Sequence, residues 1–168
     1  MPEQKTIQRA RRDKRQGKSP STQAGEFVHE EIEHVRQGKH GARSTKQAIA
    51  IGLSKARRAG VDLPPPKKGT TSARTRKSAK RDQATGQGRR RKTAKSGKRS
   101  RATRSALKRE GHRAASRKSL SRQARSSARR RSAASRSAAA RKAARTKGPH
   151  ERSAAARKAA RTRARKSR

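Results

Sequence analysis

Apolar residues recur at helical spacing in only two stretches of this 168-residue chain. The first stretch has a stripe made of Ala24, Val28, Ile32 and Val35. At 100° per residue the stripe is about 80° wide, and glutamates occupy the opposite face. Ser19 can cap a helix, Pro20 suits its first position, and Gly38 lies where it would stop. The pattern predicts an amphipathic helix from about residue 20 to residue 37.

The second stretch has a longer stripe made of Ala48, Ile49, Gly52, Leu53, Ala56 and Ala59. It is preceded by STKQ at residues 44–47, in which Ser44 can cap the helix and Gln47 can reach back as in a capping box. We expect a helix from Thr45 to about Ala59, closed by Gly60 in the left-handed conformation and by Val61 folding back on the last turn. A glycine within the stripe would let two helix backbones approach closely.

Two amphipathic helices joined by a short loop predict an αα-hairpin over residues 19–63. We expect a basic flexible arm at 1–18 before it and a polyproline spacer at 64–66 after it. Fewer than about 40 ordered residues seldom fold alone, which favours a homodimer. Phe27 and Ile51 lie off the stripes and are the candidate self-association contacts. The alternative is that both are exposed or lie under residues 61–63.

Residues 67–168, which we call the basic segment, have no such periodicity. They consist almost wholly of Arg, Lys, Ala, Ser and Thr, and SAAARKAART occurs twice, at 137–146 and at 153–162. So little apolar area cannot offset the entropy cost of ordering. The fold class predicted is therefore a small all-α hairpin followed by a long intrinsically disordered tail over 67–168, which would form short helices only when phosphates neutralise its charge.

The net charge of the chain is the strongest indication of its binding partner. The chain has 53 Lys and Arg against 10 Asp and Glu, and 39 of the basic but 3 of the acidic residues lie in the basic segment. Its natural partner is a polyanion, and a net charge of +36 matches the phosphates of about 18 base pairs of DNA. We expect phosphate contacts from the densest basic runs, at Arg89, Arg90, Arg91, Lys92, Arg129, Arg130, Arg131, Arg141, Lys142, Arg145, Arg157, Lys158 and Arg161.

Little else in the chain suggests chemistry. There is no Cys, which excludes disulfides and Cys-based zinc sites, and no nucleophile–base pair or phosphate loop is apparent. His29 and His34 are five residues apart, whereas a zinc-protease helix needs four. Glu30 with His34 would supply only two ligands, and two rarely hold a metal. We expect no enzyme activity, no catalytic residues, no metal and no cofactor.

One resemblance adds to this reading. STKQAIAIGLSKARRAG at 44–60, preceded by GEFVHEE at 25–31, resembles a small uncharacterised bacterial helical domain family with the motif S-x-K-Q-A-I-A-I-x-L-S-x-A-R-x-A-G. Many members carry Ala where Gly52 stands here. The resemblance implies a bacterial source and a helical domain, but no biochemical function. The basic segment resembles, in composition alone, the Lys/Arg/Ala-rich tails of linker-histone-like proteins.

These observations predict a non-enzymatic, nucleoid-associated, histone-like protein that binds and compacts duplex DNA with little sequence preference. The alternatives are an RNA- or ribosome-associated basic protein, and an adaptor that binds a protein partner through the hairpin. The absence of aromatic residues from the basic segment argues against base stacking on single strands. No apolar run has signal-peptide or membrane-spanning length, so we expect a soluble, cytoplasmic protein with no membrane partner.

Overall fold

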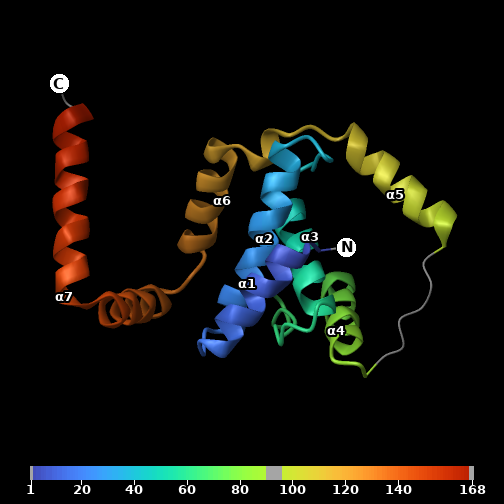
Figure 1. The fold of residues 1–168 in the computed structure, drawn as a ribbon, viewed down its shortest axis with the longest axis horizontal. Coiled ribbons are helices and arrows are strands. Elements are labelled where there is room, and N and C mark those ends of the chain that lie inside the picture. Colours follow the sequence, from blue (N-terminus) through green and yellow to red (C-terminus); the bar gives the residue numbers. More distant parts are fainter. Residues whose placement is uncertain (1, 90–95, 167–168) are drawn as a thin grey trace. The chain divides into compact units, whose positions relative to one another are not determined.

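The computed structural model describes residues 2–89 and 96–166, in which every regular element is a helix (Figure 1). The chain divides into two compact units, Met1–Gln123 and Ala124–Arg168. The elements in chain order are α1 (Gln4–Arg15), α2 (Pro20–Arg36), α3 (Thr45–Arg58), α4 (Ala73–Gly86), α5 (Gly97–Arg109), the 3₁₀ turn η1 (Arg113–Ala115), α6 (Arg117–Arg129) and α7 (Ala133–Lys166).

Both helices predicted from the apolar stripes are present, as α2 and α3. The Oγ atom of Ser44 accepts a hydrogen bond from the backbone N–H of Gln47 at 3.2 Å, so the predicted cap is confirmed. The Gln47 side chain reaches back one residue further than a capping box requires, and accepts from the N–H of Arg43 at 2.9 Å. Gly60 is left-handed, with φ of 93°, and the N–H of Val61 returns to the carbonyl of Ala56.

Helices α2 and α3 pack closely at Gly52. A Cβ atom at this position would lie 2.7 Å from Cα of Val28 and 3.0 Å from the carbonyl oxygen of Phe27. Both neighbours are backbone atoms of α2, which cannot swing aside as the end of a side chain could. The close approach expected of this glycine is therefore present.

The N-terminal residues differ from the flexible arm that was expected. They form α1, which packs on α2 through Thr6 and Ala10, both buried. Asp13 is buried too, and its carboxylate binds the ammonium of Lys18 at 2.7 Å. Two of the three buried residues of α1 are polar, so no apolar stripe in the sequence predicts this contact.

Two apolar clusters form the core of residues 1–123. The first consists of Ala10, Ala24, Phe27, Ala56 and Val61, with Ile7, Leu53 and Leu63 packed against it. The second consists of Ile32, Val35, Ala42, Ala48, Ala114 and Ala115, with Val28 and Leu120 packed against it. The turn η1 thus completes a core whose other members lie at least 66 residues earlier in the sequence. A buried hydrogen bond of 2.6 Å from Oγ1 of Thr45 to the carbonyl of Ala114 holds it there.

The prediction of a long disordered tail over 67–168 is wrong. Within its described residues the basic segment forms α4, α5, η1, α6 and α7. The first of these packs on α3, where Oγ of Ser54 donates to Oδ2 of Asp82 at 2.7 Å and Ala79 is buried. The expectation of coil in the absence of phosphates fails with it.

The physical reason lies in residues that looked like spacers. Ala and Arg are among the strongest helix formers. The serines at the starts of the helices act as N-caps, because each hydroxyl accepts a hydrogen bond from the backbone N–H three residues later. These caps are Ser72, Ser96, Ser116 and Ser132. Local signals therefore specify the helices without a large core.

Helix α7 is interrupted between the two copies of the repeat. Gly148 has φ of 64° and ψ of 170°, which is not helical, and Pro149 follows it. The copy at 137–146 lies before this break and the copy at 153–162 lies after it. Each copy is therefore a separate helical segment.

Candidate functional site

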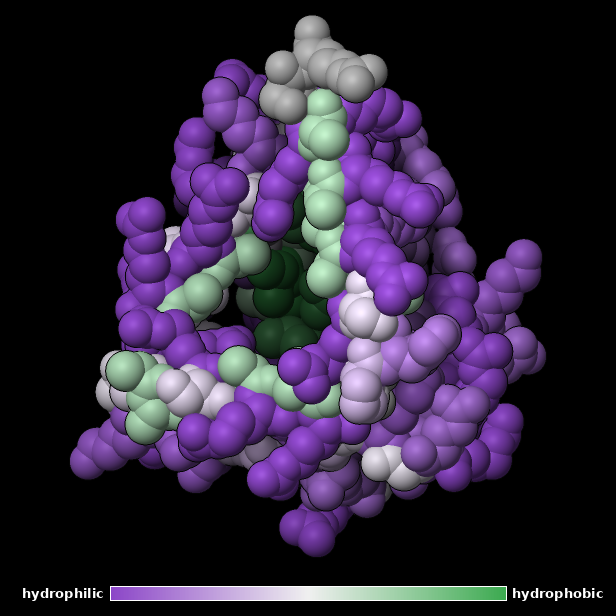
Figure 2. All heavy atoms as spheres, turned by 90° about the vertical axis from the view of Figure 1, so that its left-hand side faces the viewer, coloured by the Kyte–Doolittle hydropathy of each residue, from purple (hydrophilic) through white to green (hydrophobic). Residues whose placement is uncertain are grey.

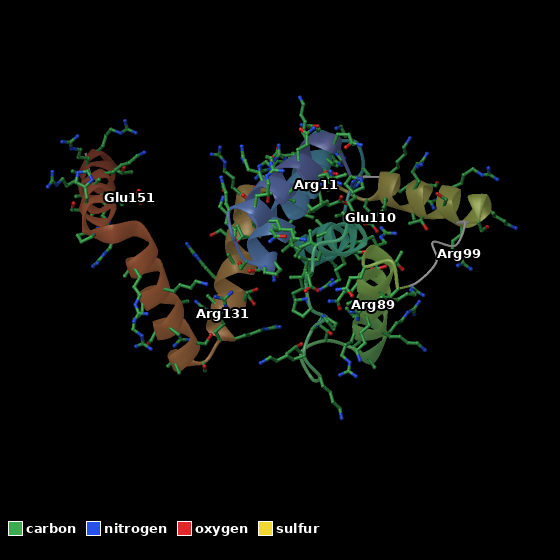
Figure 3. The ribbon with its side chains drawn as sticks, turned by 60° about the horizontal axis from the view of Figure 1, so that its bottom comes forward. Arg11, Arg89, Arg99, Glu110, Arg131 and Glu151 are labelled. Atoms are coloured by element: carbon green, nitrogen blue, oxygen red, sulfur yellow. The ribbon has the colours of Figure 1, made fainter. Side chains whose placement is uncertain are left out.

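The basic helices of the C-terminal half present their charge to solvent. Helix α5 has six Lys and Arg among 13 residues, α6 has five among 13, and neither contains an acidic residue. Neither helix has a buried residue. Nitrogen-tipped side chains project along these helices in Figure 3. In Figure 2 hydrophilic residues cover most of the face in view, and apolar residues form narrow strips.

The repeat gives α7 two basic stripes. At 100° per residue, Arg141, Lys142 and Arg145 fall within about 100° of the helix circumference, and alanines occupy the opposite side. Arg157, Lys158 and Arg161 repeat this arrangement sixteen residues later. All six side chains are exposed. As helices the copies thus have a charged face and an alanine face, whereas as coil they would have neither.

The other residues expected to bind phosphate lie in several elements. Arg89 follows α4, Arg129 ends α6, and Arg130 and Arg131 lie between α6 and α7; all four are exposed. Arg90, Arg91 and Lys92 lie outside the described residues. The expected contacts that the structure describes are therefore spread over several helices and the connections between them.

The two candidate self-association residues lie in different environments. Phe27 is 1% exposed, inside the first apolar cluster together with Val61. It is therefore not available to a second copy of the chain. Ile51 is half-buried on α3.

A group of charged side chains is buried between α2 and α3. Glu31 is fully buried and Glu30 nearly so. The ammonium of Lys55 lies 2.6 Å from Oε2 of Glu31 and 3.3 Å from Oε1 of Glu30. The second oxygen of Glu30 accepts the backbone N–H of Glu3 at 3.1 Å. One lysine thus lies between two buried carboxylates.

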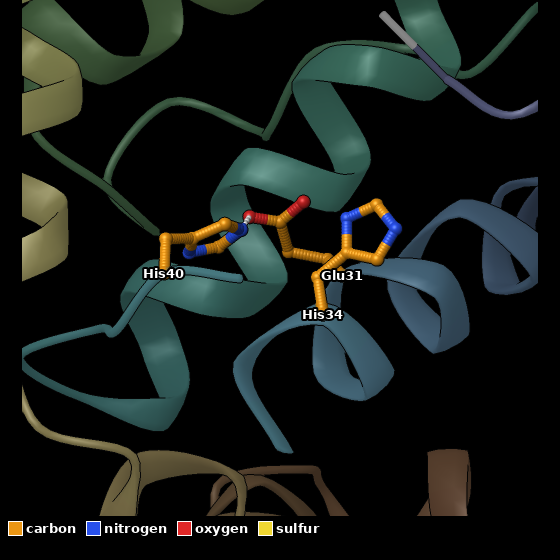
Figure 4. Close-up of side chains that lie close together, drawn as sticks. All are labelled: Glu31, His34 and His40. Atoms are coloured by element: carbon orange, nitrogen blue, oxygen red, sulfur yellow. Dashed lines mark ion pairs between the residues drawn. The ribbon is translucent and has the colours of Figure 1, made fainter. Parts of the chain in front are cut away.

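Two histidines flank the same carboxylate. Oε1 of Glu31 lies 3.2 Å from Nε2 of His40, and His34 lies one helical turn after Glu31 (Figure 4). Nε2 of His34 lies 2.8 Å from Oε1 of Glu3. Hydrogen bonds from His34 and from Lys39 lower the pKa of Glu3 to about 2.

Sequence reasoning missed this group, which we call the Glu31 cluster (Glu31, His34 and His40). It paired His34 with His29, which is exposed, and with Glu30, which instead binds Lys55. The available signal was Glu31-Ile-Glu-His34, a spacing of three that puts a carboxylate and an imidazole on one helix face. The third member comes from the loop after α2, which no helical periodicity could predict.

Comparison with protein families gives a match for the N-terminal part of the chain. Residues 3–68 match a family described as a family of unknown function (DUF6496). The match covers α1, α2 and α3, so this part of the chain is similar to an uncharacterised small helical domain. No curated protein and no solved structure matches the chain. Among the described residues, no helix is both long and apolar enough to cross a membrane.

Proposed function

We propose that the chain is a non-enzymatic DNA-binding protein, whose basic helices coat and compact duplex DNA with little sequence preference. In a bacterial cell such a protein would be associated with the nucleoid. The observation that carries the proposal is the excess of exposed Lys and Arg on α5, α6 and α7, where the only acidic residue is Glu151. Charge of one sign at this density favours binding to a polyanion.

Helical structure strengthens the electrostatic argument. A helix rises 1.5 Å per residue, so basic residues four apart lie about 6 Å apart along one face. Arg141 and Arg145 have this spacing, as do Arg157 and Arg161. A row of guanidinium groups can follow a phosphate backbone, and each arginine offers a planar fork to phosphate oxygens. Within each ten-residue copy all the charged side chains share one side of the helix, and DNA should contact that side.

The salt dependence of binding tests this proposal. We expect the full chain to bind a random-sequence duplex with a slope of log K against log salt of about −9 for ten phosphate contacts. The slope should not change appreciably with DNA sequence, because phosphate contacts carry no direct sequence information. Sedimentation of the complexes would report compaction.

A pair of matched triple variants separates charge from helix content. Replacing Arg157, Lys158 and Arg161 with Gln removes three charges from one stripe, and the slope should become shallower by about 2.7. The control replaces Ala155, Ala156 and Ala159 with Gln on the opposite face, and should leave the slope unchanged. Equal effects of the two variants would refute the charged-face reading.

Tighter binding to structured RNA than to duplex DNA at the same salt would move the proposal to an RNA-associated role.

A further inference from the structure

The Glu31 carboxylate is fully buried, and among the described residues only one of its two oxygens has an ammonium partner. Within that described part of the chain, neither oxygen accepts a hydrogen bond of good geometry. Its contacts are the ion pairs with Lys55 and His40. Buried carboxylates normally have their hydrogen bonds satisfied, and an unsatisfied one often marks a bound ion or water. Lys55 accounts for Oε2 of this carboxylate, and Oε1, with only the His40 ring beside it, is the oxygen that still lacks a cation.

The three side chains of the Glu31 cluster are suited to a metal in kind and in spacing. One ligand atom from each of Glu31, His34 and His40 lies within 4.8 Å of the others. Ligands at about 2.0 Å in a tetrahedron are separated by about 3.3 Å. The contact between Oε1 of Glu31 and Nε2 of His40 already measures 3.2 Å, and the ligand atom of His34 lies within 4.8 Å of those of Glu31 and His40. Two imidazoles and one carboxylate form a known zinc ligand set.

Both imidazoles are oriented by a partner on their far nitrogen. Nε2 of His34 lies 2.8 Å from the carboxylate of Glu3, and its other ring nitrogen faces Glu31 (Figure 4). Nδ1 of His40 lies 3.0 Å from the carbonyl of Gly41, and its Nε2 faces Glu31. Metal-binding histidines almost always donate their other N–H to a carboxylate or a carbonyl. Each ring can thus donate to its partner and turn a lone pair to the same point.

The buried charges leave room for a cation. Glu30 and Glu31 carry two negative charges, and Lys55 supplies one positive charge. With neutral imidazoles the group has a net charge of −1. Because Lys55 is closest to Oε2 of Glu31, it leaves Oε1 to a metal ion on the histidine side.

We propose that Glu31, His34 and His40 bind one zinc ion, with a water molecule as the fourth ligand. The ion would fasten α2 to the loop that follows it, and through Glu3 it would fix the start of α1. This site is independent of the proposed DNA binding, because its residues lie outside the basic segment.

Zinc titration of the metal-stripped full chain tests the proposal, with a chromophoric chelator as competitor. We expect one zinc ion per chain. His40→Ala should weaken binding by more than tenfold, and Glu3→Ala, which removes only an orienting partner, by about 10- to 100-fold. The control is His29→Ala, which removes an exposed imidazole from α2, the helix that carries Glu31 and His34, and should leave the zinc affinity unchanged.

The wild-type chain gives a second readout that needs no variant. Zinc should shift the NMR signals of the His34 and His40 rings and leave those of His29 and His150 in place. This outcome would support the site even if His40→Ala failed to fold. Absence of saturable binding, or equal affinities of the His40→Ala and His29→Ala variants when both fold, would overturn it.

Discussion

Two glycines inside helices provide a sharp test of the packing between α2 and α3. Gly25 lies on the exposed face of α2, and a Cβ atom there would meet nothing within 4 Å. Gly52 is buried on α3, and a Cβ atom there would fall roughly 0.7 Å short of ordinary contact distance from Cα of Val28. Alanine should therefore have opposite effects at the two positions.

The magnitudes follow from two opposing terms. Replacing a helical Gly with Ala gains about 1 kcal/mol in helix propensity. At Gly25 nothing opposes this gain, so Gly25→Ala should stabilise by about 0.5–1 kcal/mol. At Gly52 overpacking costs about 1–3 kcal/mol, because a rigid helix backbone must move. Gly52→Ala should therefore destabilise by about 1 kcal/mol, and the two variants should differ by about 2 kcal/mol.

The assay can use a probe specific to this core. The chain contains one Phe and no Trp or Tyr, and Phe27 is buried beside Gly52. Urea unfolding followed by the NMR signals of the Phe27 ring would report the stability of this core alone. Equal stability of the two variants would refute the reasoning.

The same urea titration tests three further substitutions. Ser44→Ala removes the hydroxyl that caps α3 and should cost about 1 kcal/mol; no loss would mean that water replaces the cap. Lys55→Met leaves the buried carboxylates without their ammonium partner and should cost about 3–5 kcal/mol, and an unchanged midpoint would contradict the buried ion pairs. Arg57, whose pKa is lowered by burial, donates to two carbonyls of the segment after α3, so Arg57→Lys should cost about 1–2 kcal/mol. Full retention of stability by that variant would show that one donor suffices.

The sequence predicted α2 and α3 well because their apolar stripes and their end signals agree. It did not predict the packing of α1, because Thr6 and Asp13 are buried polar residues that no stripe reveals. The helices of the basic segment were not predicted, because its apolar residues are too few to form a large core and this was taken to exclude ordered structure. Local signals were decisive instead, since serine caps such as Ser72 and Ser132 start helices in sequences of strong helix formers.

The candidate sites also differ in how far the sequence alone could predict them. Charge density alone selected the residues that we expect to bind phosphate, whereas the two faces of each repeat copy could be seen only once the copies were known to be helical. The Glu31 cluster depends on the path of the loop that follows α2. This loop folds back and places His40 beside Glu31 of that helix. Phe27 was predicted to be a self-association contact because it lies off the apolar stripe of α2. It is instead a core residue, because α1 packs against the side of α2 that carries it.

The turn η1 has a consequence for how the protein emerges from the ribosome. The first apolar cluster and the residues packed on it are complete once Leu63 has been made, but the second lacks two members until Ala115. At about 5–20 residues per second, the interval between these events is roughly 3–10 s. During that time Ile32, Val35 and Ala48 lack the turn that covers them in the finished protein. The nascent chain therefore passes through a state in which the first apolar cluster is complete and the second is still partly uncovered.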